Sequence, residues 1–451
     1  MTSEIYVIPV SNQNDNDKFI IFRPLPGIAF VGNRAMANLA QKLLNDDSRA
    51  DGQDEAAIFL RSIGFLESAP PPANTMGKEF VPSTAVLLLT NQCQLRCVYC
   101  YAAAGESPRK TLTAELGHSA IDAVYQTARE RGHTQFEVSF HGGGEPTMAW
   151  HVLKDCVNWA RKKTIPARIT LTTNGIWSPQ QCAWIIQNVN GLSLSMDGLP
   201  TTQDQHRPFS KGVGSSAIVL RNMAELDHYQ YPYDVRMTAI APWENLPLDV
   251  EFLCQRSDCR TIQVEPAFNT QRGEHNDPEP DNMKSFADAY MEAVEVAAKA
   301  GRRFYYSGAR LGMVATTFCT APYHALIINP DGDLIACYEV TSQSHPLAGI
   351  SRIGQIKDGQ IILDQNARKR LHALMSERRD GCSDCFCYWS CAGGCYIRSF
   401  GSPPEGHLYH GNLCDLHRQL TKSLLLKEIA RGDGVWHAVS KPMKRVAYVQ
   451  Q

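Results

Sequence analysis

The residues best suited to chemistry are three cysteines, Cys93, Cys97 and Cys100, at CxxxCxxC spacing directly after the apolar run 85–89. Thiolates are soft ligands that suit iron–sulfur clusters or zinc. If the loop holds a four-iron cluster, three cysteines leave one iron without a protein ligand, and a small molecule can take that position. The spacing therefore predicts chemistry at this loop as well as structure.

Seven further cysteines lie after residue 318, at the spacing Cys-x12-Gly-x4-Cys, a gap, CxxCx5Cx3C, a gap and a last cysteine. They are Cys319, Cys337, Cys382, Cys385, Cys391, Cys395 and Cys414. On spacing alone, such sets equally predict two structural zinc sites. The other five cysteines, Cys156, Cys182, Cys254, Cys259 and Cys387, are scattered, which favours buried thiols.

The elements that must position these residues follow an alternating pattern between residues 85 and 268. Apolar runs predict strands at 85–90, 136–140, 169–173, 192–196, 235–240 and 261–264, and helical patterns lie between them at 114–131, 150–163, 179–188 and 216–226. Six strands alternating with crossovers predict an α/β fold, a parallel sheet closed into a partial (β/α)6 barrel. In such barrels the chemistry gathers at the carboxyl ends of the strands.

Polar motifs follow these strands in turn. His141-Gly-Gly-Gly-Glu145-Pro follows the second, Thr172-Thr-Asn174-Gly175 the third and Ser195-Met-Asp197-Gly198 the fourth, while Arg236 lies on the fifth. Successive glycines let the backbone approach a ligand closely, and a carboxylate beside them can accept hydrogen bonds from an ammonium group. Each motif alone is weak evidence, because most such residues simply form turns.

In this order, the cysteine loop and the three motifs resemble the radical S-adenosylmethionine (SAM) enzymes over residues 85–268. The resemblance implies a [4Fe-4S] cluster on Cys93, Cys97 and Cys100, with SAM on the open iron. It further implies SAM contacts from Tyr99 at the adenine, Gly142, Gly143, Gly144 and Glu145 at the amino group, Ser195 and Asp197 near the polar end or ribose, and also Asn174 and Arg236. Gln205-His-Arg207, followed by Gly212 and Gly214, fits the peptide-modifying branch of this family.

Beside this barrel, the seven later cysteines resemble the SPASM extension of radical SAM enzymes, which implies two auxiliary [4Fe-4S] clusters. By position, Cys382, Cys385, Cys391 and Cys414 would hold the cluster farther from the barrel, and Cys319, Cys337 and Cys395 the nearer one. Some members supply a fourth ligand to the nearer cluster where this chain has Ala325. The nearer cluster would therefore keep an open iron or use Cys387.

The flanking regions have patterns of their own. Residues 19–22 and 27–30 predict a hairpin, and helical patterns follow at 35–44 and 55–65. This order resembles winged-helix domains that bind leader peptides as an added strand at a sheet edge. A small packing domain without a ligand is the alternative. Pro70-Pro-Pro72 predicts a linker, giving domains at 1–75, 76–310 and 311–451, and a helix over 416–429 is expected to pack back on the enzyme.

Composition bounds the function. The 451 residues are 43% hydrophobic, and the net charge of -2 from 44 basic and 46 acidic residues gives no overall attraction to nucleic acid or membrane. There is no apolar run near the ~20 residues that span a bilayer, and the first residues lack the pattern of a secretion signal. We therefore expect a cytoplasmic protein, in which fifteen cysteines favour metal binding over disulfides.

The function implied by these resemblances is a radical SAM oxidoreductase that matures a ribosomally made precursor peptide, with flavodoxin or ferredoxin as electron donor. A carbon–carbon, carbon–oxygen or thioether cross-link is expected. One alternative is formylglycine formation by a sulfatase maturase. Those enzymes carry Asp directly after the nearer cluster's second cysteine, where this chain has Tyr338 and then Glu339. A non-enzymatic metal-binding module that recruits a partner is the alternative from another class.

Overall fold

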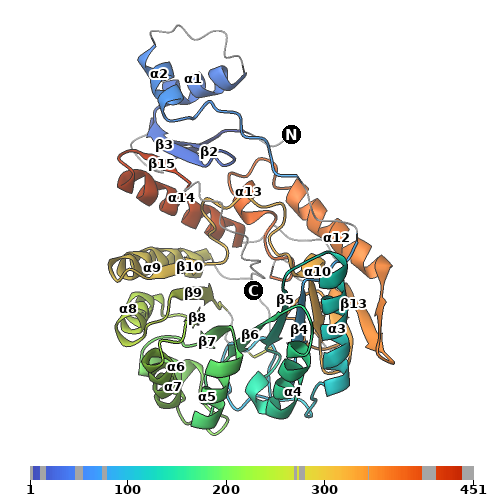
Figure 1. Cartoon of the computed structure of the whole chain (residues 1–451). Helices are drawn as coiled ribbons and strands as arrows, with labels where there is room; N and C mark the ends of the chain where they lie inside the picture. The colour runs from blue at the N-terminus through green and yellow to red at the C-terminus, as the bar shows by residue number, and fades with distance from the viewer. Residues whose placement is uncertain are drawn as a thin grey trace.

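The computed structural model describes residues 4–10, 17–45, 54–73, 79–268, 272–273, 280–343, 345–398 and 413–438. These residues form two sheets and the helices around them (Figure 1). The helices are α1 (Arg34–Asn45), α2 (Glu55–Ser62), α3 (Ala114–Glu130), α4 (Trp150–Arg161), α5 (Pro179–Asn188), α6 (Pro200–His206), α7 (Ser216–His228), α8 (Leu246–Arg256), α9 (Pro280–Lys299), α10 (Ala321–His324), α11 (Ala348–Ser351), α12 (Gln365–Asp380), α13 (Tyr388–Cys391) and α14 (Leu413–Arg431).

The larger sheet has eleven strands in the order β10-β9-β8-β7-β6-β5-β4-β11-β12-β13-β14. Their bounds are β4 (Thr84–Leu88), β5 (Phe136–His141), β6 (Ala167–Thr173), β7 (Gly191–Ser195), β8 (Tyr233–Ala239), β9 (Thr261–Pro266), β10 (Arg303–Tyr306), β11 (Ala325–Ile328), β12 (Asp333–Ile335), β13 (Arg352–Lys357) and β14 (Gln360–Leu363). All pairs from β10 through β4 to β11 are parallel. The six predicted strands and the mainly parallel α/β sheet are confirmed.

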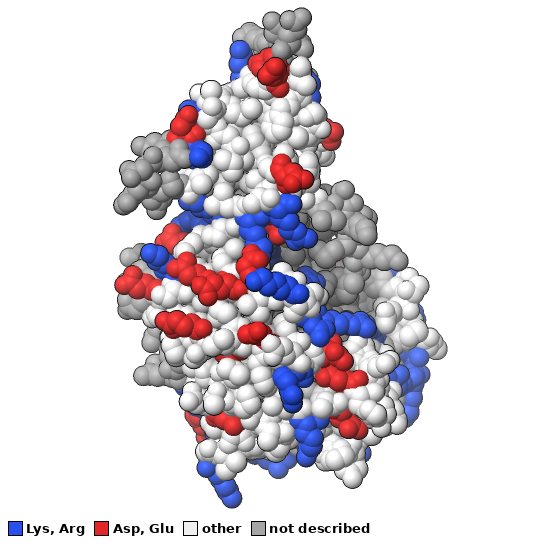
Figure 2. Space-filling model, turned by 90° about the vertical axis from the view of Figure 1, so that its left-hand side faces the viewer, with Lys and Arg blue, Asp and Glu red and all other residues white. Residues whose placement is uncertain are grey.

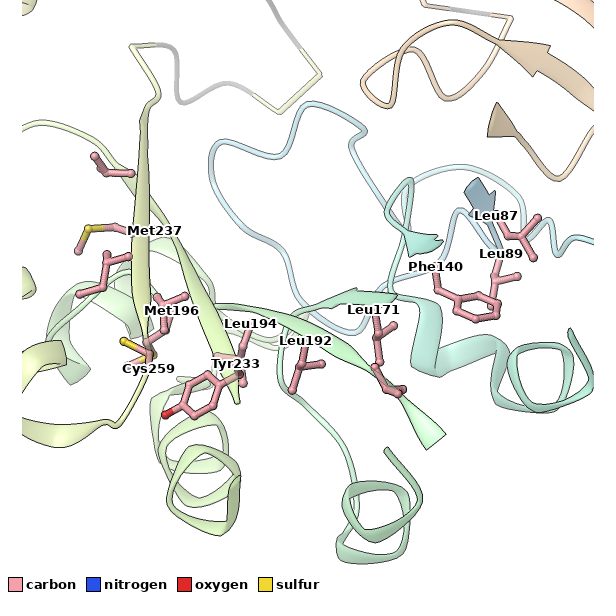
Figure 3. Close-up of a cluster of buried hydrophobic side chains, with 14 of the residues drawn as sticks. Leu87, Leu89, Phe140, Leu171, Leu192, Leu194, Met196, Tyr233, Met237 and Cys259 are labelled. Carbon is pink, nitrogen blue, oxygen red and sulfur yellow. The ribbon is translucent and has the colours of Figure 1, made fainter. Parts of the chain in front are cut away.

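Burial explains why these apolar runs become central strands. On β4, Ala85 and Leu87 pack with the helices, while Val86 and Leu88 face the opposite side against Tyr338 and the strand β11. A strand that is covered on both faces reads as a continuous apolar run. Figure 3 shows side chains from successive strands turned toward the helix layer, where they form the core.

The helices between the strands begin where the sequence offers caps. Thr113 accepts a hydrogen bond from Leu116 N at the start of α3. Ser178 and Gln181 form a reciprocal capping box at the start of α5. These caps fix where each helix returns the chain to the next parallel strand.

The cysteine-rich region continues the same sheet. A hairpin is formed by β11 and β12, with Gly332 at a φ of 81° in the turn, and β12 to β14 add antiparallel strands. Since β11 pairs with β4, the later cysteines are attached directly to the strand that precedes the first cysteine loop. The order of the predicted elements did not indicate this continuity.

The smaller sheet is antiparallel, with the order β1 (Tyr6–Pro9), β2 (Phe19–Arg23), β3 (Ile28–Gly32) and β15 (Val435–His437). The predicted hairpin and both predicted helices, α1 and α2, are present. One face packs against α1 and α2, and the other packs against Leu425 and Ile429 of α14. The predicted C-terminal helix therefore packs back on the protein, between the small sheet and the body (Figure 1).

The surface carries both signs of charge. Figure 2 shows acidic and basic side chains interspersed over one face, in keeping with the net charge of -2. Among the described helices, none is long and apolar enough to cross a membrane.

Candidate active site

The first cysteine loop leaves β4 and is held by two arginines. Arg96 donates from Nη1 to the carbonyl oxygens of Cys93 at 2.7 Å and Leu95 at 2.9 Å, and from Nη2 to that of Gly105 at 3.0 Å. Arg272, which follows β9, donates to the carbonyl oxygen of Cys97 at 2.5 Å. Each guanidinium thus satisfies main-chain carbonyls that a loop leaves unpaired.

A second chain segment runs alongside the loop. Val98 N donates to His206 O at 2.9 Å, and Arg96 N donates to Pro208 O at 2.7 Å. Leu95 and Phe209 form an isolated antiparallel bridge between these contacts. The segment after α6, which contains the Gln-His-Arg motif, therefore braces the cysteine loop through the main chain.

The glycines that follow this motif have local explanations. Gly212 turns the chain at a φ of 79°, a conformation that suits glycine. A Cβ on Gly214 would lie 2.2 Å from the carboxyl carbon of Asp204, which accepts a hydrogen bond from Ser216 N at 2.7 Å. Both glycines therefore let the chain after the motif fold back onto α6.

Glu145, predicted to meet the SAM amino group, lies buried and bonded to its neighbours. Its Oε1 accepts hydrogen bonds from Thr147 N at 3.0 Å, Thr147 Oγ1 at 2.7 Å and Thr173 Oγ1 at 2.8 Å, and its Oε2 accepts one from Asn174 N at 2.8 Å. Burial raises the pKa of this carboxyl, and these hydrogen bonds lower it again. In this arrangement the carboxylate ties the turn after β5 to the end of β6.

The glycine turn itself is packed under the cysteine loop. A Cβ on Gly144 would lie 2.2 Å from Gln92 O, and Glu145 N donates to the same oxygen at 2.8 Å. Gly143 has a φ of 111°, and a Cβ on Gly142 would lie 3.3 Å from the hydroxyl of Tyr101. Glycine is required here because the backbone of the loop occupies the space of a side chain.

Tyr99 and Asp197 are brought together with Arg207. The Tyr99 hydroxyl donates to Asp197 Oδ2 at 2.5 Å, and Arg207 Nη1 donates to the Tyr99 oxygen at 2.7 Å. Asp197 Oδ1 accepts a hydrogen bond from Thr238 N at 3.0 Å, and His206 Nδ1 lies 3.4 Å from Oδ2. Both oxygens of Asp197 are therefore engaged with the protein, and its side chain is fully buried.

The other predicted residues lie at the same ends of the strands. Asn174 Nδ2 is 3.5 Å from Cys93 Sγ. Ser195, the last residue of β7, is in register with Arg236 on β8. The structure thus gathers the residues predicted to contact SAM around the carboxyl ends of β4 to β8.

The later cysteines separate into two groups. In the first, burial raises the pKa of the Cys319 thiol to about 12, with a further contribution from Cys395 and an opposing one from Arg310. Burial is also the main cause of the raised pKa of Cys337, to which Glu339, Cys395 and Cys319 add. These three thiols are neighbours, as the SPASM resemblance implies.

The second group contains Cys382, Cys385, Cys391 and Cys414. Burial raises the pKa of Cys391 to about 12, and the other three thiols each contribute to that increase. Arg378 Nη2 lies 3.9 Å from Cys414 Sγ, and Cys382 Sγ lies 3.4 Å from the carbonyl oxygen of Arg378. These four cysteines are thus neighbours, and the buried Arg378 contacts two of them.

Cys387 belongs with this second group. Its thiol donates to Thr421 Oγ1 at 3.4 Å on α14, and a hydrogen bond with Cys385 is the largest cause of its raised pKa. A third contact, at 3.8 Å, joins its sulfur to the carbonyl oxygen of His417 on the same helix. The structure thus places Cys387 against α14 and the farther group, and its use by the nearer cluster stays a prediction.

The charges around the cysteines fit iron–sulfur clusters. A buried arginine acts on each group: Arg207 on the first loop, Arg310 on the nearer later group and Arg378 on the farther one. Thiolate-ligated clusters add negative charge to a buried site, which such cations compensate. Within the described residues no three His, Cys, Asp or Glu side chains converge on the position of a single metal ion.

Sequence reasoning missed several of these residues. Arg96 and Arg272 carry no motif, and the hydrogen bond from Arg272 joins residues 175 positions apart. Arg207 belongs to the Gln-His-Arg motif, but its polar neighbours in the sequence give no sign that it is buried.

The model of the Radical SAM superfamily matches residues 87–241. The sporulation killing factor maturation protein SkfB of Bacillus subtilis is 24% identical over 270 residues, which are 57% of this chain and 60% of SkfB. The chain thus spans less than two thirds of that relative. The serine-type anaerobic sulfatase-maturating enzyme of Klebsiella aerogenes is 22% identical over 322 residues, 67% of this chain and 76% of that enzyme.

Two solved structures share the fold. Native anSMEcpe with bound AdoMet has a TM-score of 0.64 at 17% identity, covering 78% of this chain and 100% of that one. SuiB of Streptococcus suis bound to precursor peptide SuiA has a TM-score of 0.53 at 13% identity, covering 92% and 99%. At these identities the likeness concerns the fold.

Proposed function

We propose that this chain, a radical SAM enzyme related to SPASM-domain peptide maturases, oxidises a side chain of a ribosomally made precursor peptide and forms an intramolecular cross-link. One observation carries the proposal: the chain just after Cys337 lies against the carboxyl end of β5, where the ring of Tyr338 packs 4.7 Å from that of His141. Burial raises the pKa of Tyr101, and the thiols of Cys100 and Cys337 add to that increase.

This proximity suits an oxidation that removes two electrons from one substrate. When bound, the reduced cluster and SAM supply a 5′-deoxyadenosyl radical that abstracts a hydrogen atom from carbon. The chain contributes buried apolar residues in the cysteine loop and at the ends of β7 and β8, among them Leu95, Met196 and Ala239, and such surroundings favour the exclusion of water. A second electron would then pass to an auxiliary cluster, which the later cysteines would hold, and the accompanying proton would be lost to solvent. We propose three [4Fe-4S] clusters in total.

Formylglycine formation is less well supported by the residues at the nearer group. Tyr338 stands where the sulfatase maturases carry Asp, and its ring packs 4.7 Å from that of His141. The adjacent Glu339 accepts hydrogen bonds from Arg398 Nη2 at 3.0 Å and Nε at 3.3 Å. Arg398 also pairs with Glu265 at 2.8 Å, so Glu339 belongs to a charge network and is not a free proton acceptor.

We propose that the small sheet binds the precursor's leader, as part of a winged-helix-like domain over residues 1–75. The edge of β3 is taken by β15, with Val435 opposite Phe30 and His437 opposite Ile28. At the other side of the sheet, β2 is the only described strand that pairs with β1, so the outer edge of β1 is open to an added strand. A leader that adds as a strand would therefore use β1 or exchange with β15.

Mass spectrometry of a peptide co-expressed with the enzyme tests the reaction. The candidate peptide is the product of a short neighbouring reading frame. Loss of two hydrogens per event supports cross-linking, whereas an aldehyde that reacts with hydrazine supports the sulfatase-maturase reaction. Replacing Cys97 with Ala should abolish the mass change, and Cys254→Ala is the matched control because Cys254 lies in the barrel core away from all three groups.

Metal analysis tests the alternative of a non-enzymatic metal-binding module. About twelve irons with matching sulfide are expected per anaerobically purified chain. Two or three zinc ions without sulfide would contradict the radical mechanism. Reduced flavodoxin or ferredoxin should then support SAM cleavage by the iron-loaded protein.

A further inference from the structure

Arg207 is a buried cation without a carboxylate partner. It is 7% exposed, and no Asp or Glu among the described residues forms an ion pair with it. Its Nε has no hydrogen-bond partner in this part of the chain, and its Nη1 donates to the Tyr99 hydroxyl. Burying a charge is costly unless other charges or hydrogen bonds compensate it. Asp197 acts on Arg207 only through the Tyr99 hydroxyl, so a further negative charge beside the guanidinium would stabilise it.

The cysteine loop is the source of that charge. The guanidinium carbon of Arg207 lies 5.9 Å from the centre of the Tyr99 ring, two residues from Cys97. Asp197 is also near, but its oxygens already bind Tyr99 and Thr238 N. A Cys97 thiolate that ligates iron would supply the charge that the guanidinium lacks.

The main chain fixes this arrangement. Arg207 is the C-cap of α6, and its N–H donates to Gln203 O at 2.8 Å. Its two neighbours, His206 and Pro208, each accept a hydrogen bond from the cysteine loop through their carbonyl oxygens. The main chain on both sides of Arg207 is therefore tied to the cysteine loop.

We propose that Arg207 is a positioning residue for the cluster loop, which places a fixed positive charge beside Cys97 and holds the hydroxyl of Tyr99 against Asp197. A fixed cation beside a cluster favours the reduced form, because reduction adds negative charge to the site. It also holds Tyr99 in one orientation, and Tyr99 is the residue expected at the adenine of SAM. The Gln-His-Arg motif would thus affect both the reduction of the cluster and the binding of SAM.

The test measures the reduction potential of the cluster on Cys93, Cys97 and Cys100 in the full, iron-loaded chain without peptide. This cluster is identified as the one whose electron paramagnetic resonance signal changes when SAM is added. Arg207→Met removes the charge with a similar chain length, and Arg207→Lys keeps the charge. Lys211→Met is the matched control, because Lys211 is an exposed cation four residues along the same segment.

We expect Arg207→Met to lower the reduced fraction at a fixed solution potential about tenfold, which is a shift of about 59 mV to more negative values for one electron. Arg207→Lys should recover at least half of that shift, and Lys211→Met should show none. Equal potentials for the wild type and Arg207→Met would overturn the proposal. So would equal shifts for the Met and Lys variants, since the charge would then be irrelevant.

Two further measurements cover a variant that does not assemble its cluster. If Arg207→Met binds four fewer irons while Arg207→Lys and Lys211→Met load fully, the charge is needed to hold the loop, as proposed. Tyr99→Phe removes only the hydroxyl, and it should weaken SAM binding severalfold while leaving the potential unchanged. The inference rests on the cluster of the proposed function but not on its peptide chemistry, so failure to modify a peptide would leave these results unaffected.

Discussion

Replacement of Glu145 tests whether this carboxylate holds the site together before any cofactor binds. It accepts four hydrogen bonds from the turn after β5 and the end of β6. Glu145→Gln keeps one carbonyl oxygen and places an NH₂ group against the N–H of Asn174. Glu145→Gln should lower the free energy of unfolding by about 1–3 kcal/mol, because a hydrogen bond to a charged group is lost and a buried N–H is left unsatisfied. Glu145→Ala removes both acceptor oxygens and thus all four hydrogen bonds, and we expect it to lower the free energy of unfolding by about 3–5 kcal/mol.

The assay is amide hydrogen exchange at Asn174 in the cluster-free chain, supported by denaturant unfolding. Exchange is preferable because a chain with several domains need not unfold in one step. Glu137→Gln is the control, since Glu137 lies on β5, the strand before the Glu145 turn, and accepts a hydrogen bond from the partly exposed Arg168 at 3.2 Å. It should cost about 1 kcal/mol or less and leave Asn174 protected. Unchanged exchange in Glu145→Gln, together with weaker SAM binding, would show that the carboxylate is free to serve as a ligand and refute the argument.

Three further outcomes are expected. Gly144→Ala should release the first cysteine loop, because its Cβ would overlap Gln92 O, and the iron bound there should fall while the auxiliary iron remains. Trp436→Ala should cost about 3–5 kcal/mol of local stability and raise amide exchange in β3, because Trp436 packs in the core beneath the small sheet. Asp249 has its pKa raised by burial to about 6, so its protonated form stabilises the fold below pH ~4 and this stability is lost as the pH rises through 6. Asp249→Asn stays neutral, and its stability relative to the wild type should grow by roughly 3 kcal/mol between pH 4 and 7 in urea titrations.

The strands and their motifs could be predicted from the sequence because their signals are local. A strand covered on both faces must be apolar throughout, so β4 and β5 are visible as runs, and the residues at their ends then fall at one edge of a parallel sheet. The same logic placed the first cysteine loop and Asn174 together, and the structure has Asn174 Nδ2 3.5 Å from Cys93 Sγ.

Contacts between distant segments could not be predicted in this way. β15 has three residues, which are too few to show a periodic pattern. Its pairing with β3 becomes visible only in the folded protein. The partners of Glu145 and Asp197 were also hidden, because a carboxylate in a motif gives no sign of whether it faces a ligand or the protein. Cys387 is a similar case, since its spacing allowed a role at the nearer group and tertiary packing placed it against Thr421.

One helix joins the parts of the chain that the proposed reaction requires. α14 begins beside Cys414, and one turn later His417 lies 3.6 Å from Cys391 Sγ and 3.1 Å from the hydroxyl of Tyr306 at the end of β10. Its far half supplies Leu425 and Ile429 to the core beneath the small sheet. A 19-residue helix is a stiff element of roughly 28 Å, so a shift at the sheet is carried to the auxiliary cysteines. If the small sheet binds a leader as proposed, that binding would act through α14 on the farther cysteine group. The effect of a substitution at Leu425 should therefore be measured both at the small sheet and at these cysteines.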